Sequence, residues 1–139
     1  MTTLENKVAV ITGAAGSIGR EAVRIFQREG ATVVGVDVQG ESDADLFIKA
    51  DLTNEDDVRS LYQSVVEAYG KIDILFNNAG MGGPPVLLED LPFEAWQSVV
   101  NVNLTGMFLC TQGAFRLMKA QEPMGGRIVN NGSISAHAP

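Results

Sequence analysis

A glycine-rich turn near the start of the chain places Gly13, Gly16 and Gly19 at regular intervals between a short apolar run and a helical pattern. At the start of a helix, N–H groups without intrahelical partners point outward, and the helix dipole favours negative charge near them. Glycine has no Cβ atom, so a phosphate group can approach the backbone closely. A tight turn without a ligand would use the same glycines, but the strand before and the helix after them favour pyrophosphate binding.

A carboxylate, Asp37, stands at the end of the second apolar run. In this position a carboxylate can accept hydrogen bonds from both ribose hydroxyls of an adenosine, and it would repel a 2′-phosphate. The next residue is Val38, and neither Arg nor Lys occurs between Gly13 and Gly19. The sequence therefore predicts NAD rather than NADP as the cofactor. A solvated carboxylate at a strand end is the alternative interpretation.

Parallel strands are needed to bring these groups together. Short β-branched runs alternate with longer helical patterns along the chain, which is typical of βαβ units. The sequence predicts strands at residues 7–11, 32–36, 46–50, 73–76 and 127–130. Most are continuous apolar runs, which suits strands buried on both faces, and right-handed crossovers would cover both faces with helices. We expect an α/β fold with a Rossmann-type doubly wound parallel sheet in a three-layer α/β/α sandwich.

Two helices are predicted within the first half of the chain. One covers residues 16–29. The other has apolar residues at i, i+3, i+4 and i+7 spacing within residues 53–70, where Thr53 is the expected N-cap and Gly70 the expected end.

A longer helix is predicted from residue 92 to about residue 119, with a break expected near residues 103–106. Cys110 within it is expected to be a small buried residue, because nothing nearby would make a thiol reactive. Four further apolar residues are expected to pack on this helix: Trp96, Val99, Val100 and Met107.

The composition fits one globular domain, since the chain has 139 residues, of which 45% are hydrophobic and 19% charged. The net charge of −7 argues against electrostatic binding to nucleic acid or to an anionic membrane. The first residues lack the pattern of a signal peptide, and no apolar run approaches the length of a membrane span. The single cysteine excludes an internal disulfide, which fits a reducing compartment. We therefore expect a cytoplasmic protein.

The strand at residues 127–130 would lie at or near an uncovered sheet edge if the polypeptide ended at Pro139. Proteins normally shield such edges, because an unpaired strand backbone promotes association. We therefore expect residues 1–139 to be a nucleotide-binding domain that is incomplete at its C-terminus.

Five motifs, in order, resemble those of the short-chain dehydrogenase/reductase family. They are TGAAGSIG at 12–19, ADLTNEDDV at 50–58, NNAG at 77–80, NVNLTG at 101–106 and GRIVNNGSIS at 126–135. The resemblance covers the whole chain. It implies an NAD-dependent oxidoreductase that interconverts a secondary alcohol and a ketone by hydride transfer, acting on a small molecule as a homodimer or homotetramer.

The resemblance also implies roles for particular residues. Around the cofactor pyrophosphate it places Thr12, Gly13, Ser17, Ile18 and Gly19. Around the adenosine ribose and the adenine it places Asp37, Asp51 and Leu52. Beneath the adenosine side of the cofactor it places Asn78, Ala79 and Gly80, with Asn77 tying the central strands together. Asn103 matches an asparagine that helps hold a water in a proton relay, and Ser133 matches the catalytic serine.

Ser133 lies beyond the last predicted strand, where an open parallel sheet binds its ligands. Its hydroxyl can donate a proton to a carbonyl oxygen that gains negative charge as hydride arrives. A turn or capping role is the alternative, and Ser135 is a competing candidate for the chemistry. The family's base is a tyrosine about a dozen residues further on, whose pKa is lowered by a lysine one helical turn later. We expect the complete protein to encode both after Pro139.

Other functions stay open at this stage. The spacing Gly13-x-x-Gly16-x-x-Gly19 follows the extended branch of the family, which includes nucleotide-sugar epimerases and dehydratases, whereas the commonest branch has a glycine where this chain has Ser17. The three later motifs favour the commonest branch. A catalytically inactive nucleotide-sensing module is a further alternative. His137, the only histidine, has no second ligand at metal spacing, so no metal site is expected.

Overall fold

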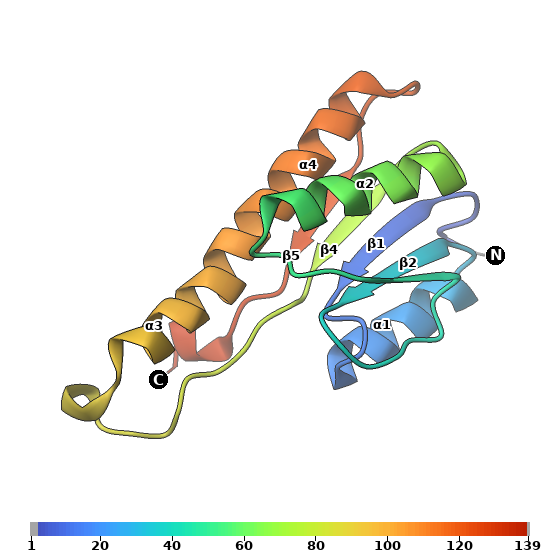
Figure 1. Cartoon of the computed structure of the whole chain (residues 1–139). Coiled ribbons are helices and arrows are strands. Elements are labelled where there is room, and N and C mark those ends of the chain that lie inside the picture. The colour runs from blue at the N-terminus through green and yellow to red at the C-terminus, as the bar shows by residue number, and fades with distance from the viewer. Residues whose placement is uncertain (1–2, 139) are drawn as a thin grey trace.

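One five-stranded parallel sheet forms the centre of the computed structural model, which describes residues 3–138. Its strands are β1 (Val8–Thr12), β2 (Thr32–Asp37), β3 (Leu46–Lys49), β4 (Ile74–Asn77) and β5 (Arg127–Asn130). The strand order is β3-β2-β1-β4-β5, and Figure 1 shows β2, β1, β4 and β5 side by side in this order. The chain runs outward from β1 to β3 and then crosses to the other side of β1. In such a sheet the point of reversal, between β1 and β4, opens a crevice at the carboxyl ends of the strands.

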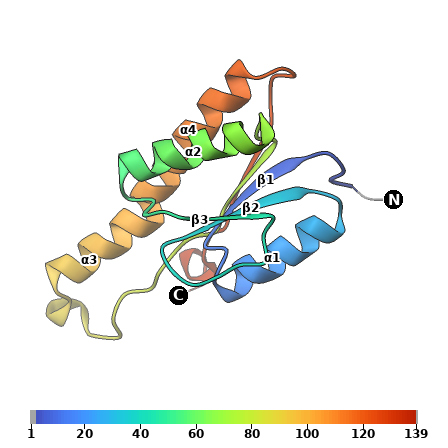
Figure 2. The same ribbon diagram turned by 45° about the vertical axis from the view of Figure 1, so that its right-hand side comes forward.

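Helices cover both faces of the sheet. They are α1 (Ser17–Arg28), α2 (Glu55–Tyr69), α3 (Phe93–Val100) and α4 (Gly106–Ala120). Helix α1 lies on one face, and α2 and α4 lie on the other (Figure 2). Within β1, Ile11 packs in the core beneath α1, and Val10 packs in the core beneath α2 and α4. The predicted doubly wound, three-layer α/β/α sandwich is therefore confirmed.

Burial on both faces is confirmed only for the centre of the sheet. All five residues of β1 and most of β2 are buried. The prediction is wrong for β3 and β5, whose residues are half-buried or exposed, because these strands form the two edges of the sheet. Val129 in β5 is 48% exposed. Within residues 3–138, β5 therefore lies at an edge of the sheet.

Helix α2 is capped by Asn54 and not by the predicted Thr53. The Asn54 Oδ1 accepts hydrogen bonds from the backbone N–H groups of Asp56 at 2.9 Å and Asp57 at 3.0 Å. The Thr53 hydroxyl instead donates to Asp51 Oδ1 at 2.7 Å, and Thr53 makes no capping hydrogen bond to α2. The helix ends at Gly70, which has a left-handed φ of 77°, as predicted.

The long helical segment does not break at the expected place but widens. One π-helical turn, Asn101–Thr105, joins α3 to α4. A wide turn of this kind changes the direction in which side chains project, and such turns are frequent at functional sites. Cys110 in α4 is 1% exposed, as predicted, and burial raises the pKa of its thiol to about 12.

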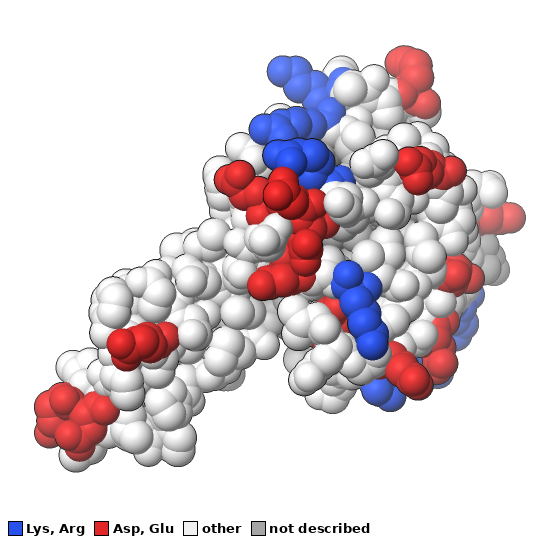
Figure 3. Space-filling model, in the orientation of Figure 1, with Lys and Arg blue, Asp and Glu red and all other residues white. Residues whose placement is uncertain are grey.

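The end of the molecule formed by α3 and the loop before it carries little charge. Figure 3 shows acidic side chains and otherwise uncharged atoms on this projection. Trp96 was predicted to pack on its helix, but it is 49% exposed and stacks on the exposed ring of Phe93, with ring centroids 5.9 Å apart. Val99, Val100 and Met107 are half-buried.

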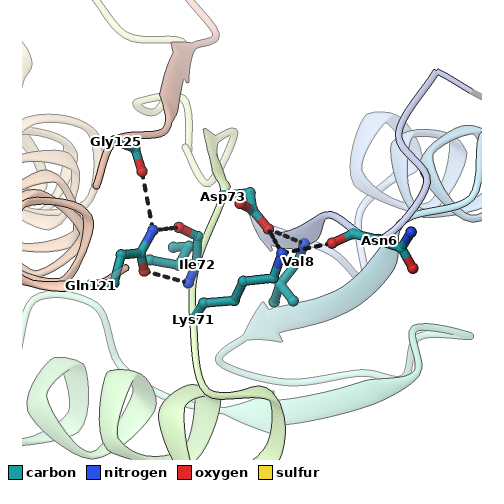
Figure 4. Close-up of polar contacts among 7 residues, drawn as sticks. All are labelled: Asn6, Val8, Lys71, Ile72, Asp73, Gln121 and Gly125. Carbon is teal, nitrogen blue, oxygen red and sulfur yellow. Dashed lines mark hydrogen bonds and ion pairs between the residues drawn. The ribbon is translucent and has the colours of Figure 1, made fainter. Parts of the chain in front are cut away.

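Polar side chains join the strands at the end of the sheet opposite the crevice (Figure 4). Gln121, just after α4, accepts a hydrogen bond from the Ile72 N–H at 3.0 Å and donates to the Ile72 carbonyl at 2.7 Å. Asp73 accepts from the Val8 N–H at 2.8 Å and pairs with Lys71 at 2.9 Å. These contacts fix β1, β4 and α4 to one another at that end.

We predict that Gly113→Ala destabilises the protein. A Cβ at this position of α4 would lie 2.3 Å from the buried ring of Tyr62, whose hydroxyl donates to the carbonyl of Cys110. Alanine gains about 1 kcal/mol in helix propensity. Overpacking outweighs that gain, so we expect a net loss of about 2 kcal/mol in the free energy of unfolding.

Urea denaturation of Gly113→Ala beside Gly82→Ala measures the effect. A Cβ at Gly82 has no described atom within 4 Å, so this control should change stability by less than about 0.5 kcal/mol. Equal unfolding midpoints for the two variants would show that the Tyr62 ring moves without cost.

Candidate functional site

A cleft of about 870 Å³ opens at the carboxyl ends of the strands, within the size range of cofactor and ligand pockets. The turn between β1 and α1, the ends of β2, β4 and β5, the loop after β3 and the π-helical turn all contribute to its wall. The predicted site residues in its lining are Gly13, Ser17, Ile18, Gly19, Asp37, Asp51, Leu52, Asn78, Ala79, Gly80, Asn103 and Ser133. Residues far apart in the sequence therefore meet in one place.

Two glycines give the β1–α1 turn its shape. Gly13 has a φ of +65°, and a Cβ there would lie 3.0 Å from the Cα of Ala79. A Cβ at Gly19 would lie 2.0 Å from the carbonyl oxygen of Gly13, a separation that no side chain can adopt. At Gly16, the residue before α1, a Cβ would keep 3.4 Å from the same oxygen. Gly13 and Gly19 are thus sterically required, whereas Gly16 is under much weaker constraint.

The first turn of α1 presents backbone N–H groups to the cleft. Ser17, Ile18 and Gly19 occupy this turn, and the N–H groups at such positions have no partner within the helix. The N-cap residue Gly16 has no side chain that could cap them. This arrangement is suited to binding an anion, since the helix dipole adds to the N–H groups.

Thr12 lies beneath this cleft and not among the residues that line it. Its side chain is 1% exposed. Its hydroxyl oxygen accepts hydrogen bonds from the N–H groups of Asn78 and Ala79, each at 2.9 Å, and donates to the Phe76 carbonyl at 3.4 Å. Thr12 therefore holds the backbone after β4, and it would act on a ligand only through that backbone.

Two consecutive asparagines tie the end of β4 to its neighbours. The Asn77 Nδ2 donates to Asn130 Oδ1 at 2.9 Å and to Thr111 Oγ1 at 3.0 Å, which links β4 to β5 and to α4. The Asn78 Nδ2 donates to the Thr12 carbonyl at 3.1 Å. The floor of the cleft is thereby fixed to three strands.

Asp37 is held in place by backbone donors. Its Oδ2 accepts from the Ala15 N–H at 3.0 Å, and its Oδ1 accepts from the Val38 N–H at 2.8 Å. The carboxylate therefore shapes the glycine-rich turn and also lines the cleft beside it.

Asp51 is the second carboxylate in the lining. Hydrogen bonds from the hydroxyl and the backbone N–H of Thr53 lower the pKa of its carboxyl group. Because the pKa is lowered from a value already well below neutrality, Asp51 is ionised at neutral pH.

Asn103 projects from the π-helical turn to the loop after β4. Its Oδ1 accepts from the Met81 N–H at 2.8 Å, and its Nδ2 donates to the Met81 carbonyl at 2.9 Å. A Cβ at Gly80 would come within 3.3 Å of the same Oδ1, so a small residue there suits this contact. The amide of Asn103 thus fixes the rim of the cleft.

Ser133 begins the short 3₁₀ helix Ile134–Ala136 and lines the cleft. Its Oγ accepts a hydrogen bond from the Ser135 N–H at 3.1 Å. Capping uses a lone pair of this oxygen and leaves the hydroxyl proton available, so the capping and chemical interpretations are compatible. Ser135 and His137 do not occur in the lining formed by the described residues.

Several lining residues were missed by the sequence analysis. Gln39, Asn131 and Gly132 follow directly after strand ends, which is a signal that could have indicated them. Val102 lies within the π-helical turn and Met107 lies just after it, and no local pattern predicts the geometry of this turn. Among residues 3–138, no group of three or more His, Cys, Asp or Glu side chains could hold a metal ion. In the same residues, no helix has the length and apolar character needed to cross a membrane.

Sequence comparison identifies the family to which the chain belongs. The family model described as short chain dehydrogenase matches residues 7–139. The chain belongs to the short-chain dehydrogenase/reductase family. The resemblance inferred from the five motifs is therefore confirmed.

Individual relatives in this short-chain dehydrogenase/reductase family are similar over most of the chain. Borneol dehydrogenase, mitochondrial, of Lavandula x intermedia is 43% identical over 123 residues, which cover 83% of this chain and 48% of the relative. Secoisolariciresinol dehydrogenase of Forsythia intermedia is 37% identical over 145 residues, covering 96% of this chain and 51% of the relative. The chain thus spans about half the length of these curated relatives.

A solved structure supports the same assignment. The crystal structure of 3-ketoacyl-(acyl-carrier-protein) reductase from Brucella melitensis complexed with NADH has a TM-score of 0.93 and 34% sequence identity. The match covers 99% of this chain and 61% of that chain. Members of this family are oxidoreductases that bind a nicotinamide cofactor.

We predict that Thr12→Val destabilises the protein more than Thr12→Ser. Valine keeps the shape but removes the hydroxyl, so the N–H groups of Asn78 and Ala79 lose their acceptor. We expect a loss of about 2 to 3 kcal/mol in the free energy of unfolding. Serine keeps the acceptor and loses one buried methyl group, at about 1 kcal/mol. Urea denaturation measures both, and a valine variant as stable as the serine variant would contradict this role.

Proposed function

We propose that the protein is an NAD-dependent oxidoreductase that interconverts a secondary alcohol and a ketone by hydride transfer. The single observation that carries this proposal is one cleft that combines the N–H groups of α1, the Asp37 carboxylate and the Ser133 hydroxyl. The similarity to proteins named as dehydrogenases, and to a reductase structure with NADH, supports it.

The cleft fits a dinucleotide on grounds of shape and of donors. A Cβ at Gly19 would collide with the carbonyl of Gly13, and a Cβ at Gly13 would meet the backbone of Ala79, so the turn has no side chain at either position and its backbone can lie close to a bound phosphate. The N–H groups of Ser17, Ile18 and Gly19 would hold the pyrophosphate, and Asp37 the adenosine ribose. We assign the adenine to Asp51 and Leu52, and the floor of the site to Asn78, Ala79 and Gly80. When bound, NAD supplies the hydride acceptor, and NADH the donor.

Asp37 is the basis for proposing NAD over NADP. Both of its oxygens accept backbone hydrogen bonds, so the carboxylate cannot turn away from a nearby phosphate without losing them. A 2′-phosphate would bring negative charge next to this fixed negative charge. The nearby guanidinium of Arg20 donates through Nε to the Ala15 carbonyl at 2.8 Å and is not part of the cleft lining described by the structure.

In the proposed reaction Ser133 donates its hydroxyl proton in a hydrogen bond to the substrate oxygen, which gains negative charge during ketone reduction. Asn103 is assigned a supporting role in proton transfer, since it fixes the Met81 backbone at the rim. Neither tyrosine of this chain lies in the cleft lining: Tyr62 is buried under α4 and Tyr69 ends α2. We therefore propose that the base, a tyrosine followed four residues later by a lysine, is encoded after Pro139, as part of a longer domain.

Assembly and location are also proposals. Exposed aromatic side chains on α3 and α4, Phe93, Trp96, Phe108 and Phe115, support a homodimer or homotetramer in which some of them become buried. A cytoplasmic location is supported by the single cysteine, which cannot form an internal disulfide.

We predict that Ser133→Ala lowers kcat of the full-length protein by about 10²- to 10³-fold, because a hydrogen-bond donor to the developing negative charge is lost. The affinity for NAD should stay the same. Activity is measured as NADH formation over a panel of secondary alcohols, with Ser135→Ala as the matched control, expected to remain active. If the unaltered protein binds NAD but reduces none of it with any alcohol, the protein is a nucleotide-binding module and not an enzyme of this type.

We predict that the unaltered protein binds NAD at least about 10-fold more tightly than NADP, and that Asp37→Asn reduces this preference by a similar factor. Asparagine keeps the size of the side chain and removes its charge. Titration calorimetry with each nucleotide measures the two dissociation constants. Arg20→Ala is the control. If the unaltered protein binds NADP more tightly than NAD and Arg20→Ala loses affinity for NADP, the proposed preference for NAD is wrong.

A further inference from the structure

A single side-chain hydrogen bond joins the loops that follow β4 and β5. The Asn131 Nδ2 donates to Asn78 Oδ1 at 2.9 Å. The orientation of Asn78 is fixed, because its Nδ2 faces the carbonyl oxygens of Thr12 and Gly13, at 3.1 and 3.5 Å, which can only accept. Its Oδ1 must therefore point to Asn131, and Asn131 must present its NH₂ group.

This contact completes a path from the glycine-rich turn to the loop that carries Ser133. The Gly13 and Thr12 carbonyls bind the Asn78 amide, the Asn78 amide binds Asn131, and Ser133 follows two residues later. Asn131 also lines the cleft, beside Ser133. The path is made of side-chain amides at strand ends, so it links the floor of the cofactor cleft to the proposed catalytic group.

The loop after β5 has few other restraints. Among the described residues, the hydrogen bonds that connect residues 131–138 to the rest of the chain all come from Asn131: its N–H donates to the Asn77 carbonyl at 3.0 Å, and its side chain donates to Asn78. The remaining hydrogen bonds of the segment, such as that from the Ser135 N–H to Ser133 Oγ, are internal. A Cβ at Gly132 would find no described atom within 4 Å. Within residues 3–138, hydrogen bonds therefore anchor the segment at one residue.

We propose that Asn131 is a positioning residue that holds Ser133 in place relative to the cofactor cleft through its bond to Asn78. The proposal rests on the function proposed for Ser133. A hydroxyl donor must be placed to within a fraction of an ångström, and an error of about 1 Å costs about 10²-fold in rate. Because Asn131 is exposed, its bond adds little to global stability, and its loss should be measured as misplacement and not as unfolding.

Two substitutions in the full-length protein test the bond. Asn131→Ala removes it, and Asn131→Asp keeps the shape but turns an oxygen toward Asn78 Oδ1, so that two acceptors face each other. The matched control is Gln63→Ala, which removes another exposed side-chain amide bond, to Glu67 on α2, remote from the cleft. Amide hydrogen exchange of residues 132–136 without ligand is the first readout, and kcat with the dissociation constant for NAD is the second.

We expect both Asn131 variants to raise exchange in residues 132–136 by at least about 5-fold with an unchanged melting temperature. kcat should fall by about 10-fold or more, while the NAD dissociation constant changes by less than about 3-fold. The control should change none of these quantities. In an Asn78→Ala background, Asn131→Ala should raise exchange no further, because the partner is already missing.

Unchanged exchange in the Asn131 variants, an additive effect in the Asn78→Ala background, or raised exchange with unchanged kcat would each overturn the proposal. A full-length protein that oxidises none of the alcohols is a failure of the proposed function and not of the bond. In that case the exchange measurements still decide whether Asn131 anchors the loop.

Discussion

The close approach of α1 to the end of β1 is the constraint on which the rest of the cleft depends. Gly19 lies against the carbonyl of Gly13 at a separation that leaves no room for a Cβ atom. Only this approach allows the helix to start directly above the crevice, so that its first N–H groups face the cleft. The same turn then offers its other backbone groups to side chains: Ala15 donates to Asp37, and the Gly13 carbonyl accepts from Asn78.

Polar side chains at the strand ends mostly serve the backbone around the cleft. Thr12, Asn77 and Asn103 each make two or more hydrogen bonds to other parts of the chain. These bonds restrain the backbone around the cleft. Its lining then presents backbone N–H groups, the carboxylates of Asp37 and Asp51, and the hydroxyls of Ser17, Thr53 and Ser133.

The sequence predicted the elements better than the contacts between them. Five strands and the doubly wound arrangement follow from apolar runs and from the handedness of crossovers, and the glycine turn follows from its spacing. Such patterns do not show which of several neighbouring side chains makes a given hydrogen bond. Thr53 was the predicted helix cap, but its hydroxyl donates to Asp51, and Asn54 caps the helix. Thr12 belongs to a motif, yet whether its side chain faces the cleft or lies beneath it depends on strand pairing.

The protein is acidic, and the ligand proposed for its cleft, NAD, is also negatively charged, so their overall charges repel each other. The net charge of −7 is the balance of 17 acidic and 10 basic side chains, and at physiological salt charges further apart than about 8 Å are largely screened. Within that distance of a phosphate at the turn, the dominant features are the helix N-terminus and its unpaired N–H groups. The fixed carboxylate of Asp37 is a negative charge near this anion site. In the proposed binding mode it faces the ribose hydroxyls, which can donate hydrogen bonds to it, and not the pyrophosphate. Local geometry, and not net charge, therefore determines which anion this cleft can accept.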